Sequence, residues 1–168
     1  HISRIYDDFG EIPHLGYFYV MEYIRGVSMR HFIQKQEQLP SLNWCISIMG
    51  QLCEALQIAH DAGVVHRDLK PDNLILLQKR QYPDFVKVLD FGIAKPLKGT
   101  IQTRLTQGAL GTPFYMSPEQ CLAKDIGPAS DIYAMGVILF DVLVGHTPFA
   151  YTDGSARTPA ELIAAKLM

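Results

Sequence analysis

Polar side chains interrupt an otherwise apolar stretch of the chain, between Val64 and Leu77. Five of them are candidates for chemistry: His66, Arg67, Asp68, Lys70 and Asn73. A charged group in a folded interior costs on the order of several kcal/mol unless it is paired or ligated. The stretch is therefore either a solvated turn or a place where these groups bind something outside the chain.

A second acid closes the next apolar run: Asp90 ends "FVKVLD", and Phe91 and Gly92 follow it. If this run pairs with "LILL" (74–77) as a hairpin, Asp90 returns to lie beside Asn73. One carboxylate and one amide oxygen form a hard-oxygen pair suited to Mg²⁺, which keeps water ligands and takes others from phosphate. The pair predicts a magnesium site.

The spacing inside the polar stretch adds two further functions. Lys70 follows Asp68 by two positions, so both side chains point to the same side of an extended segment. The lysine is placed to neutralise a phosphate, which leaves the acid to orient an attacking hydroxyl. These are the parts that phosphoryl transfer needs, because that reaction depends mainly on positioning and charge stabilisation.

These residues need strands to position them, and the sequence offers two pairs. The aromatic and β-branched run "YFYVMEYI" (17–24) predicts a strand. "ISRIY" (2–6) predicts its partner across a long loop, in which residues 6–11 are expected to form a solvated turn. "QKRQYPD" (78–84) is expected to join the "LILL" and "FVKVLD" strands.

Two helices are predicted before the polar stretch. Ser28 is expected to cap a short helix that runs to Gln36, and Ser41 is expected to cap a longer one. Gly63 marks the end of the second helix with a left-handed residue. The apolar positions of that helix follow helical spacing: Leu42, Cys45, Ile46, Met49, Leu52, Cys53, Leu56 and Ala59.

The C-terminal half contains a long loop and an apolar helix. Residues 92–116 show no periodicity, and a loop of that length inside a domain is usually functional. Ser130 is expected to cap a helix over 131–144, which is hydrophobic nearly all round and therefore expected to be buried. Asp141 interrupts this run, which is shorter than the roughly 20 residues that a membrane span needs.

Composition bounds the class of protein. The chain has 168 residues, of which 48% are hydrophobic and 19% charged, as in a single globular domain. Its net charge of −2, without basic runs, excludes recognition of nucleic acid through phosphate charge. Cys45, Cys53 and Cys121 form no metal-binding or disulfide pattern, so we expect free thiols in the cytoplasm. The first two are expected to be small core residues.

Four phrases occur in a fixed order: "HRDLKPDN", "DFG", "GTPFYMSPEQ" and "SDIYAMGVIL". Together they resemble the eukaryotic-type (Hanks-type) serine/threonine protein kinases. The residues from "GTPFYMSPEQ" through "GHTPF" resemble the bacterial members more than the animal ones. The resemblance implies an α+β, protein kinase-like two-lobe fold. Residues 1–24 would be a remnant of the small lobe and the hinge, and residues 25–168 a large lobe that is incomplete at its C-terminus.

The resemblance assigns catalytic roles to the polar residues. Asp68 would be the catalytic base and Lys70 would contact the transferred phosphate. Asn73 and Asp90 would hold the Mg²⁺, or Mn²⁺ in its place, that accompanies ATP. The lysine after the catalytic acid implies transfer to Ser and Thr hydroxyls of proteins, including the kinase's own loop.

Other roles implied by the resemblance are structural or regulatory. His66 and Phe91 would stack in the internal spine of the domain, Asp131 would anchor the catalytic loop, and Glu119 matches a structural glutamate of the family. Arg67 would pair with a phosphate on the activation loop, for which the candidates are Thr106 first, then Thr103 and Thr100. Thr112 would bridge the base and Lys70.

The adenine of ATP would bind along the strand predicted over 17–24. Met21 would be the gatekeeper residue, and the main chains of Glu22 and Ile24 would hydrogen-bond to adenine. Ile75 would form the floor of that pocket, and Ser28 would contact the ribose.

The family's Gly-rich loop, its strand lysine and its paired glutamate are missing from the sequence. We therefore expect these residues to be a kinase fragment with little activity alone, so that activity is best measured on the complete parent protein. The parent is expected in the cytoplasm, with or without a membrane anchor elsewhere, and this segment is expected to make no membrane contact. Two alternatives stay open: a pseudokinase or binding scaffold, and, more remotely, a small-molecule phosphotransferase.

Overall fold

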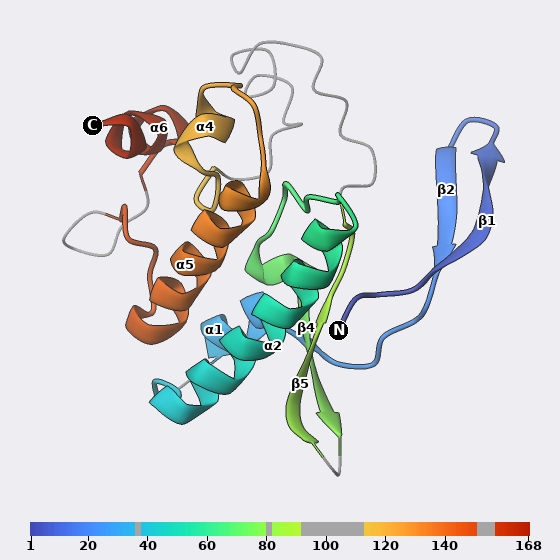
Figure 1. Ribbon diagram of the computed structural model, residues 1–168, viewed down its shortest axis with the longest axis horizontal. Coiled ribbons are helices and arrows are strands. Elements are labelled where there is room, and N and C mark those ends of the chain that lie inside the picture. Colours follow the sequence, from blue (N-terminus) through green and yellow to red (C-terminus); the bar gives the residue numbers. More distant parts are fainter. Residues whose placement is uncertain (36–37, 80–81, 92–112, 151–156) are drawn as a thin grey trace.

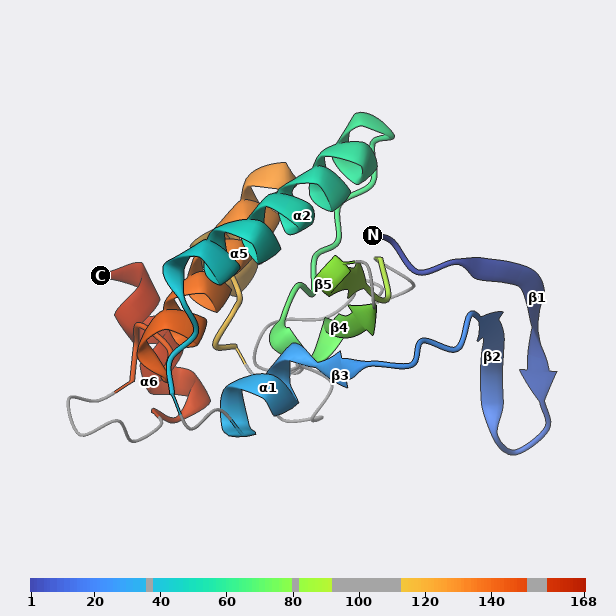
Figure 2. The ribbon, with the colours of Figure 1, turned by 90° about the horizontal axis from the view of Figure 1, so that it is seen from below.

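The computed structural model describes residues 1–35, 38–79, 82–91, 113–150 and 157–168. Two long helices, α2 (Leu42–Asp61) and α5 (Pro128–Val144), pack against each other, and a three-stranded sheet packs on α2 through its last strand. A two-stranded hairpin stands apart from this body (Figures 1 and 2). The predicted α+β class is confirmed.

The separate hairpin consists of β1 (Ile5–Ile12) and antiparallel β2 (Gly16–Met21). The prediction of a solvated turn over residues 6–11 is wrong, because those residues belong to β1, which pairs with β2 with a bulge or irregularity between Ile5 and Phe9. The chain reverses at 13–15 instead, where His14 and Gly16 adopt positive φ angles of 68° and 99°. Proline and glycine flank this reversal and so favour the turn there over the acidic run.

The three-stranded sheet has the order β3-β4-β5, with β3 (Val27–Ser28), β4 (Leu74–Lys79) and β5 (Tyr82–Val88) antiparallel. The two longer strands form the predicted hairpin, but they extend further than predicted, and only residues 80–81 separate them. Leu74 pairs with Val88, and the Leu89 amide donates to the Asn73 carbonyl at 2.8 Å. The hairpin therefore brings Asp90 back towards Asn73, as predicted.

Side-chain caps define the helices around the polar stretch. The Ser28 hydroxyl accepts from the His31 amide at the start of α1 (Met29–Lys35), and the Ser41 hydroxyl accepts from the Trp44 amide at the start of α2. Gly63, with φ 74°, ends α2 as predicted. Three shorter elements are also found among the described residues: η1 (Pro71–Asn73), α4 (Pro118–Cys121) and α6 (Pro159–Leu167).

Helix α5 starts earlier than predicted. Gly127 is its N-cap and Pro128 its first residue, so Ser130 lies inside the first turn and does not cap the helix. Proline at the first position loses no helical hydrogen bond and favours this earlier start. The helix is also less buried than its sequence predicts: Ile132, Phe140 and Val144 are exposed.

The core lies between α2, α5 and the β4–β5 hairpin. Its fully buried side chains include Met29, Ile48, Leu52, Leu74 and Val86. Cys45 is buried as predicted, but Cys53 is exposed, although its sulfur lies 3.7 Å from the Met135 sulfur on α5. Within the described ranges, none of the helices is both long and apolar enough to cross a bilayer.

Gly26 permits a close approach between two backbones, and its replacement is expected to destabilise the fold. A Cβ atom at this position would lie 2.5 Å from Ile75 Cγ2 and 2.5 Å from the Leu76 carbonyl oxygen on β4. We expect Gly26→Ala to lower the denaturant midpoint of the domain. Gly50→Ala, at an exposed position of α2, is the control, since a Cβ there meets nothing within 4 Å. It should raise the free energy of unfolding by up to about 1 kcal/mol. Equal midpoints for the two variants would contradict the assignment.

Candidate functional site

The polar loop, residues 66–73, connects the end of α2 to β4, and a buried histidine begins it. His66 Nε2 lies 2.8 Å from the Leu89 carbonyl oxygen, and its Nδ1 lies 3.3 Å from the Asp68 amide nitrogen. A carbonyl only accepts and an amide only donates, so Nε2 carries the proton and Nδ1 does not. Burial lowers the pKa of His66, which agrees with this neutral form.

A buried acid on α5 holds the start of the loop. Asp131 is 1% exposed, and its two oxygens accept hydrogen bonds from the main-chain amides of His66, at 2.8 Å, and Arg67, at 2.9 Å. His60 at the end of α2 donates to the same carboxylate at 2.8 Å. Arg67 adopts a positive φ of 66°, an unfavourable conformation for this residue that the surrounding contacts hold in place.

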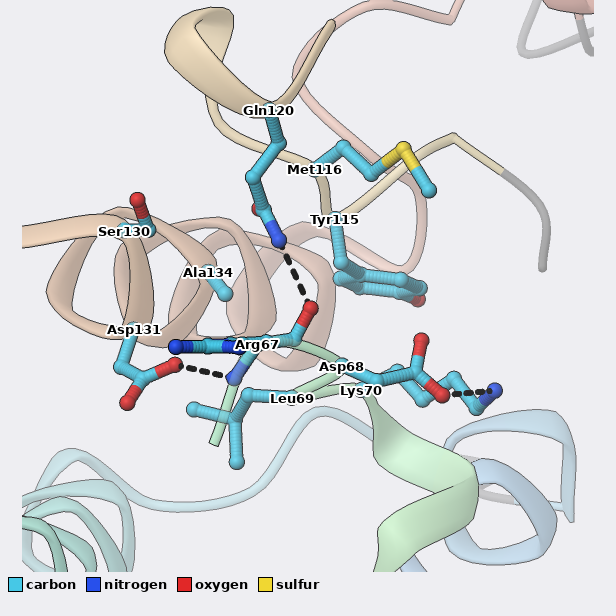
Figure 3. Close-up of a pocket in the computed structure, with 10 residues that line it drawn as sticks. All are labelled: Arg67, Asp68, Leu69, Lys70, Tyr115, Met116, Gln120, Ser130, Asp131 and Ala134. Atoms are coloured by element: carbon cyan, nitrogen blue, oxygen red, sulfur yellow. Dashed lines mark hydrogen bonds and ion pairs between the residues drawn. The ribbon is translucent and has the colours of Figure 1, made fainter. Parts of the chain in front are cut away.

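Two of the predicted catalytic side chains meet in the loop, and a third bonds to the main chain of the loop. Lys70 Nζ lies 3.0 Å from Asp68 Oδ2, so the cation and the acid form an ion pair, drawn in Figure 3. The side-chain amide nitrogen of Asn73 donates to the main-chain carbonyl of Asp68 at 2.8 Å. Asp68 and Lys70 are each about a quarter exposed and so face solvent, whereas Asn73 is buried.

Asp90 lies at the end of the β4–β5 hairpin, and its carboxylate is already engaged. The Tyr19 hydroxyl on β2 donates to Asp90 Oδ1 at 2.6 Å. This hydrogen bond, with burial, raises the pKa of Tyr19 to about 12. Asp90 itself has a positive φ of 53°, a second unfavourable backbone conformation beside the polar loop.

Tyr115 and Met116 line the opposite side of a pocket above the loop (Figure 3), and residues 114–116 are called the wall segment below. Tyr115 is buried against α5, where its hydroxyl donates to Asp141. Gln120 on α4 joins the two sides, because its amide nitrogen donates to the Arg67 carbonyl at 2.7 Å. The same glutamine forms a reciprocal cap with Ser117 at the start of α4.

Two contacts involve the residues predicted to be structural, His66 with Phe91 and Glu119 with Ser130. The rings of His66 and Phe91 are in contact, with centroids 4.8 Å apart, but they are tilted by 58° and not stacked. Glu119 accepts a hydrogen bond from the Ser130 hydroxyl on α5. Ser130 thus bonds to α4 from within α5.

The predicted adenine-binding residues follow β2 and β4. Met21 ends β2 and pairs with Ile5, while Ser28 pairs with Ile75 across β3 and β4. The Glu22 amide donates to the Arg4 carbonyl at 2.9 Å.

The side chain of Glu22 forms an ion pair with Lys87. Ile24 follows β2 as a half-buried residue in the connection to β3, so the strand is shorter than the predicted 17–24. None of these predicted adenine-binding residues lines the pocket at the polar loop.

The predicted regulatory threonines lie outside the described residues. They are Thr100, Thr103, Thr106 and Thr112. Of the regulatory set, only Arg67 is described, and both its amide and its carbonyl are engaged by neighbouring helices.

Sequence reasoning missed several residues that build the site. Tyr19 was seen only as part of an aromatic strand, and Arg30 was not singled out. Arg30 on α1 lies 3.4 Å from Asp72 and 3.8 Å from Asp141. A local signal existed for Gln120 alone, since "SPEQ" is a capping-box pattern. The other contacts join residues far apart in sequence, which no local pattern reports.

The arrangement combines an acid and a cation at a solvent-facing pocket with a second acid and an amide oxygen nearby. Such a set can orient a hydroxyl, neutralise a phosphate and hold a hard cation. The unfavourable backbone angles at Arg67 and Asp90 mark the same place, as expected for a site whose geometry is held by its surroundings.

Comparison with known proteins gives one family. The sequence model of one protein family, described as protein kinase domain, matches residues 1–166. The chain is 43% identical over 145 residues to serine/threonine-protein kinase pkn3 of Myxococcus xanthus, which covers 84% of this chain and 26% of that protein. It is 40% identical over 133 residues to serine/threonine-protein kinase PknA of Mycobacterium tuberculosis, covering 79% and 30%.

A third relative is serine/threonine-protein kinase PknB of Mycobacterium leprae, at 34% identity over 140 residues, covering 83% of this chain and 21% of that protein. The chain thus spans between a fifth and a third of the length of these curated relatives.

Proposed function

Because the chain belongs to the protein kinase domain family, as a member related to bacterial serine/threonine kinases, we propose that the complete protein transfers the γ-phosphate of ATP to Ser and Thr hydroxyls of proteins. One observation carries this proposal. Asp68, Lys70 and Asn73 converge in one loop, and the β4–β5 hairpin returns Asp90 to the end of that loop. The proposal makes the protein an ATP-dependent transferase.

In this proposal the residues of the loop divide the work. The Asp68 carboxylate accepts a hydrogen bond from the substrate hydroxyl and takes its proton as the hydroxyl oxygen bonds to the γ-phosphorus of ATP. The bond from that phosphorus to the oxygen bridging the β-phosphate breaks, and ADP leaves. Lys70, 3.0 Å from that carboxylate, lies where it stabilises the negative charge on the transferred phosphoryl group. The hydrogen bonds that the buried Asp131 carboxylate accepts from the loop fix its position. The reaction needs this because it depends on positioning.

The donor set at the hairpin end suits a magnesium ion. Asp90 supplies a carboxylate and Asn73 an amide oxygen, while the Asn73 amide nitrogen is used by the Asp68 carbonyl. Mg²⁺ favours such oxygen donors, keeps several waters and takes the remaining ligands from phosphate. When bound with ATP, the ion neutralises charge on the phosphates. Mn²⁺ is expected to substitute, since it prefers the same oxygen donors.

We further propose that residues 1–24 form the end of a small lobe and the hinge, and residues 25–168 the large lobe. The β1–β2 hairpin, which stands apart from the helical body in Figures 1 and 2, supports this division. Adenine is then expected beside Met21, the main chains of Glu22 and Ile24, and Ile75. Ser28 is expected near the ribose, although its hydroxyl already caps α1.

Regulation by phosphorylation is proposed on charge alone. Arg67 precedes the proposed catalytic acid, and a phosphothreonine within residues 92–112 would pair with its guanidinium. Thr106 is the first candidate, with Thr103 next, and Thr112 is proposed to bridge Asp68 and Lys70. Phosphate mapping after incubation with ATP tests these assignments.

Removing the amide oxygen of the metal site should weaken the response to Mg²⁺. We expect Asn73→Ala in the complete protein to raise the Mg²⁺ concentration needed for half-maximal phosphate transfer by about tenfold, because one of two protein ligands is lost. Asn43→Ala, an exposed amide on α2, is the control and should leave that concentration unchanged. EDTA should stop transfer by the wild type. Transfer that continues in EDTA, or equal Mg²⁺ requirements for both variants, would contradict the metal assignment.

A further inference from the structure

Lys166 is buried in a way that is unusual for a lysine. It lies near the end of α6, yet only 8% of its surface is exposed. Lysine is almost never buried to this extent unless it is paired. Its ammonium group donates hydrogen bonds to the main-chain oxygens of Phe114, at 2.7 Å, and Met116, at 2.5 Å. Both carbonyls belong to the wall segment of the pocket.

Two aromatic rings enclose the same ammonium group. Nζ lies 5.2 Å from the ring centroid of Tyr133 on α5 and 5.2 Å from that of Phe149. Among the described residues no carboxylate forms an ion pair with Lys166. Carbonyl oxygens and aromatic faces attract a cation more strongly than a neutral amine, so the surroundings favour the charged form locally. Burial opposes them and lowers the pKa of Lys166 to about 8.

Tyr115 is the residue between the two carbonyls, and it is therefore held from two helices. Its hydroxyl donates to Asp141 on α5, and the main-chain carbonyls of the residues before and after it accept hydrogen bonds from Lys166 on α6. Tyr115 faces the pocket opposite Asp68 and Lys70, as Figure 3 shows. Any peptide that reached Asp68 through this pocket would lie against the wall segment.

We propose that Lys166 is a positioning residue for protein substrates, which holds the wall segment where an acceptor hydroxyl can reach Asp68. This inference rests on the proposed function, because the wall has a protein substrate only if the protein phosphorylates proteins. Lys166 lies behind the wall and acts through Phe114 and Met116. Without its ammonium group, both carbonyls lose their buried donor, and the wall is expected to move towards water to satisfy them.

Substitution of Lys166 in the complete protein tests this inference. We expect K166M to raise the KM for dephosphorylated casein about tenfold, while the KM for ATP stays within about twofold of the wild-type value. K166R, which keeps a cation with several donors, should recover most of the loss. K124M, at an exposed lysine in the loop after α4, is the matched control and should resemble the wild type.

A pH profile separates a charged clamp from simple packing. The ammonium group loses its proton as the pH rises through about 8, so the wild-type KM for casein should rise between about pH 7 and 9. K166R should show no such rise, because a guanidinium stays charged. The titratable groups that face Nζ are Cys121 on α4 and Tyr133 on α5. Burial raises the pKa of both Cys121 and Tyr133, so neither supplies a competing charge in that range.

Three results would overturn the inference: an unchanged KM for casein in K166M, equal rises for casein and ATP, or a wild-type pH profile that K166R shares. If the wild type transfers no phosphate at all, the proposed function fails separately. Amide hydrogen exchange then decides whether Lys166 holds the wall. Residues 113–121 should exchange faster in K166M than in K124M, and equal exchange would show that it does not.

Discussion

Replacing Asp68 by asparagine is expected to lower phosphate transfer by the complete protein by about 100- to 10,000-fold, the usual contribution of a catalytic base. Asparagine has nearly the same shape as aspartate, but its amide cannot take the proton of an attacking hydroxyl. It also ends the ion pair with Lys70, whose Nζ lies 3.0 Å from the carboxylate. The rate of transfer to casein, measured with saturating ATP and Mg²⁺, gives the size of the loss.

Binding and folding provide the controls for this variant. Asp68→Asn should bind ATP with Mg²⁺ as the wild type does, because Asn73 and Asp90 are unchanged and carry the proposed metal site. Asp125→Asn removes the same charge from an exposed position and should keep the wild-type rate. Transfer by Asp68→Asn within about threefold of the wild type would remove Asp68 from the role of base.

Replacing Asp131 by alanine is expected to lower the free energy of unfolding of the domain by about 3–5 kcal/mol. The substitution leaves the main-chain amides of His66 and Arg67 without their acceptor, and each unsatisfied buried group costs about 1–3 kcal/mol. His60 loses its partner as well. Denaturant unfolding, followed by circular dichroism, measures the change.

A local readout distinguishes loss of the anchor from a general loss of stability. In Asp131→Ala the amides of His66 and Arg67 should exchange hydrogen faster than those of the β4–β5 hairpin. Asp131→Asn, which keeps one acceptor oxygen, should show a smaller effect. Asp125→Ala should stay within about 0.5 kcal/mol of the wild type, as expected for an exposed residue. A change of that size in Asp131→Ala too would contradict the anchoring role.

The sequence predicted the elements with local signals. Ser28, Ser41 and Gly63 mark helix ends because capping is set by neighbouring residues, and the structure confirms all three. The β4–β5 hairpin was predicted from two apolar runs, and it carries Asp90 back to Asn73. The polar loop could be recognised for a related reason, since charged side chains in an apolar stretch need a function or a partner.

Contacts between distant residues could not be predicted in the same way. The Tyr19 hydroxyl on β2 donates to Asp90, 71 positions later in the chain, and the sequence has no pattern for that contact. Cys53 is exposed, although its spacing resembled that of the buried positions, because the apolar stripe of α2 is wider than the face that packs. Ser130 fitted a cap by type, but Pro128 allowed α5 to begin before it.

Covalent transfer of phosphate is the most direct test of the central claim, that the site formed by Asp68, Lys70, Asn73 and Asp90 phosphorylates proteins. The complete protein should be incubated with γ-labelled ATP, Mg²⁺ and casein, and the labelled amino acids identified by mass spectrometry. Label on serine and threonine, absent with Asp68→Asn, is the predicted result. Binding of ATP without any transfer by the wild type would contradict the claim and show a kinase-fold scaffold instead.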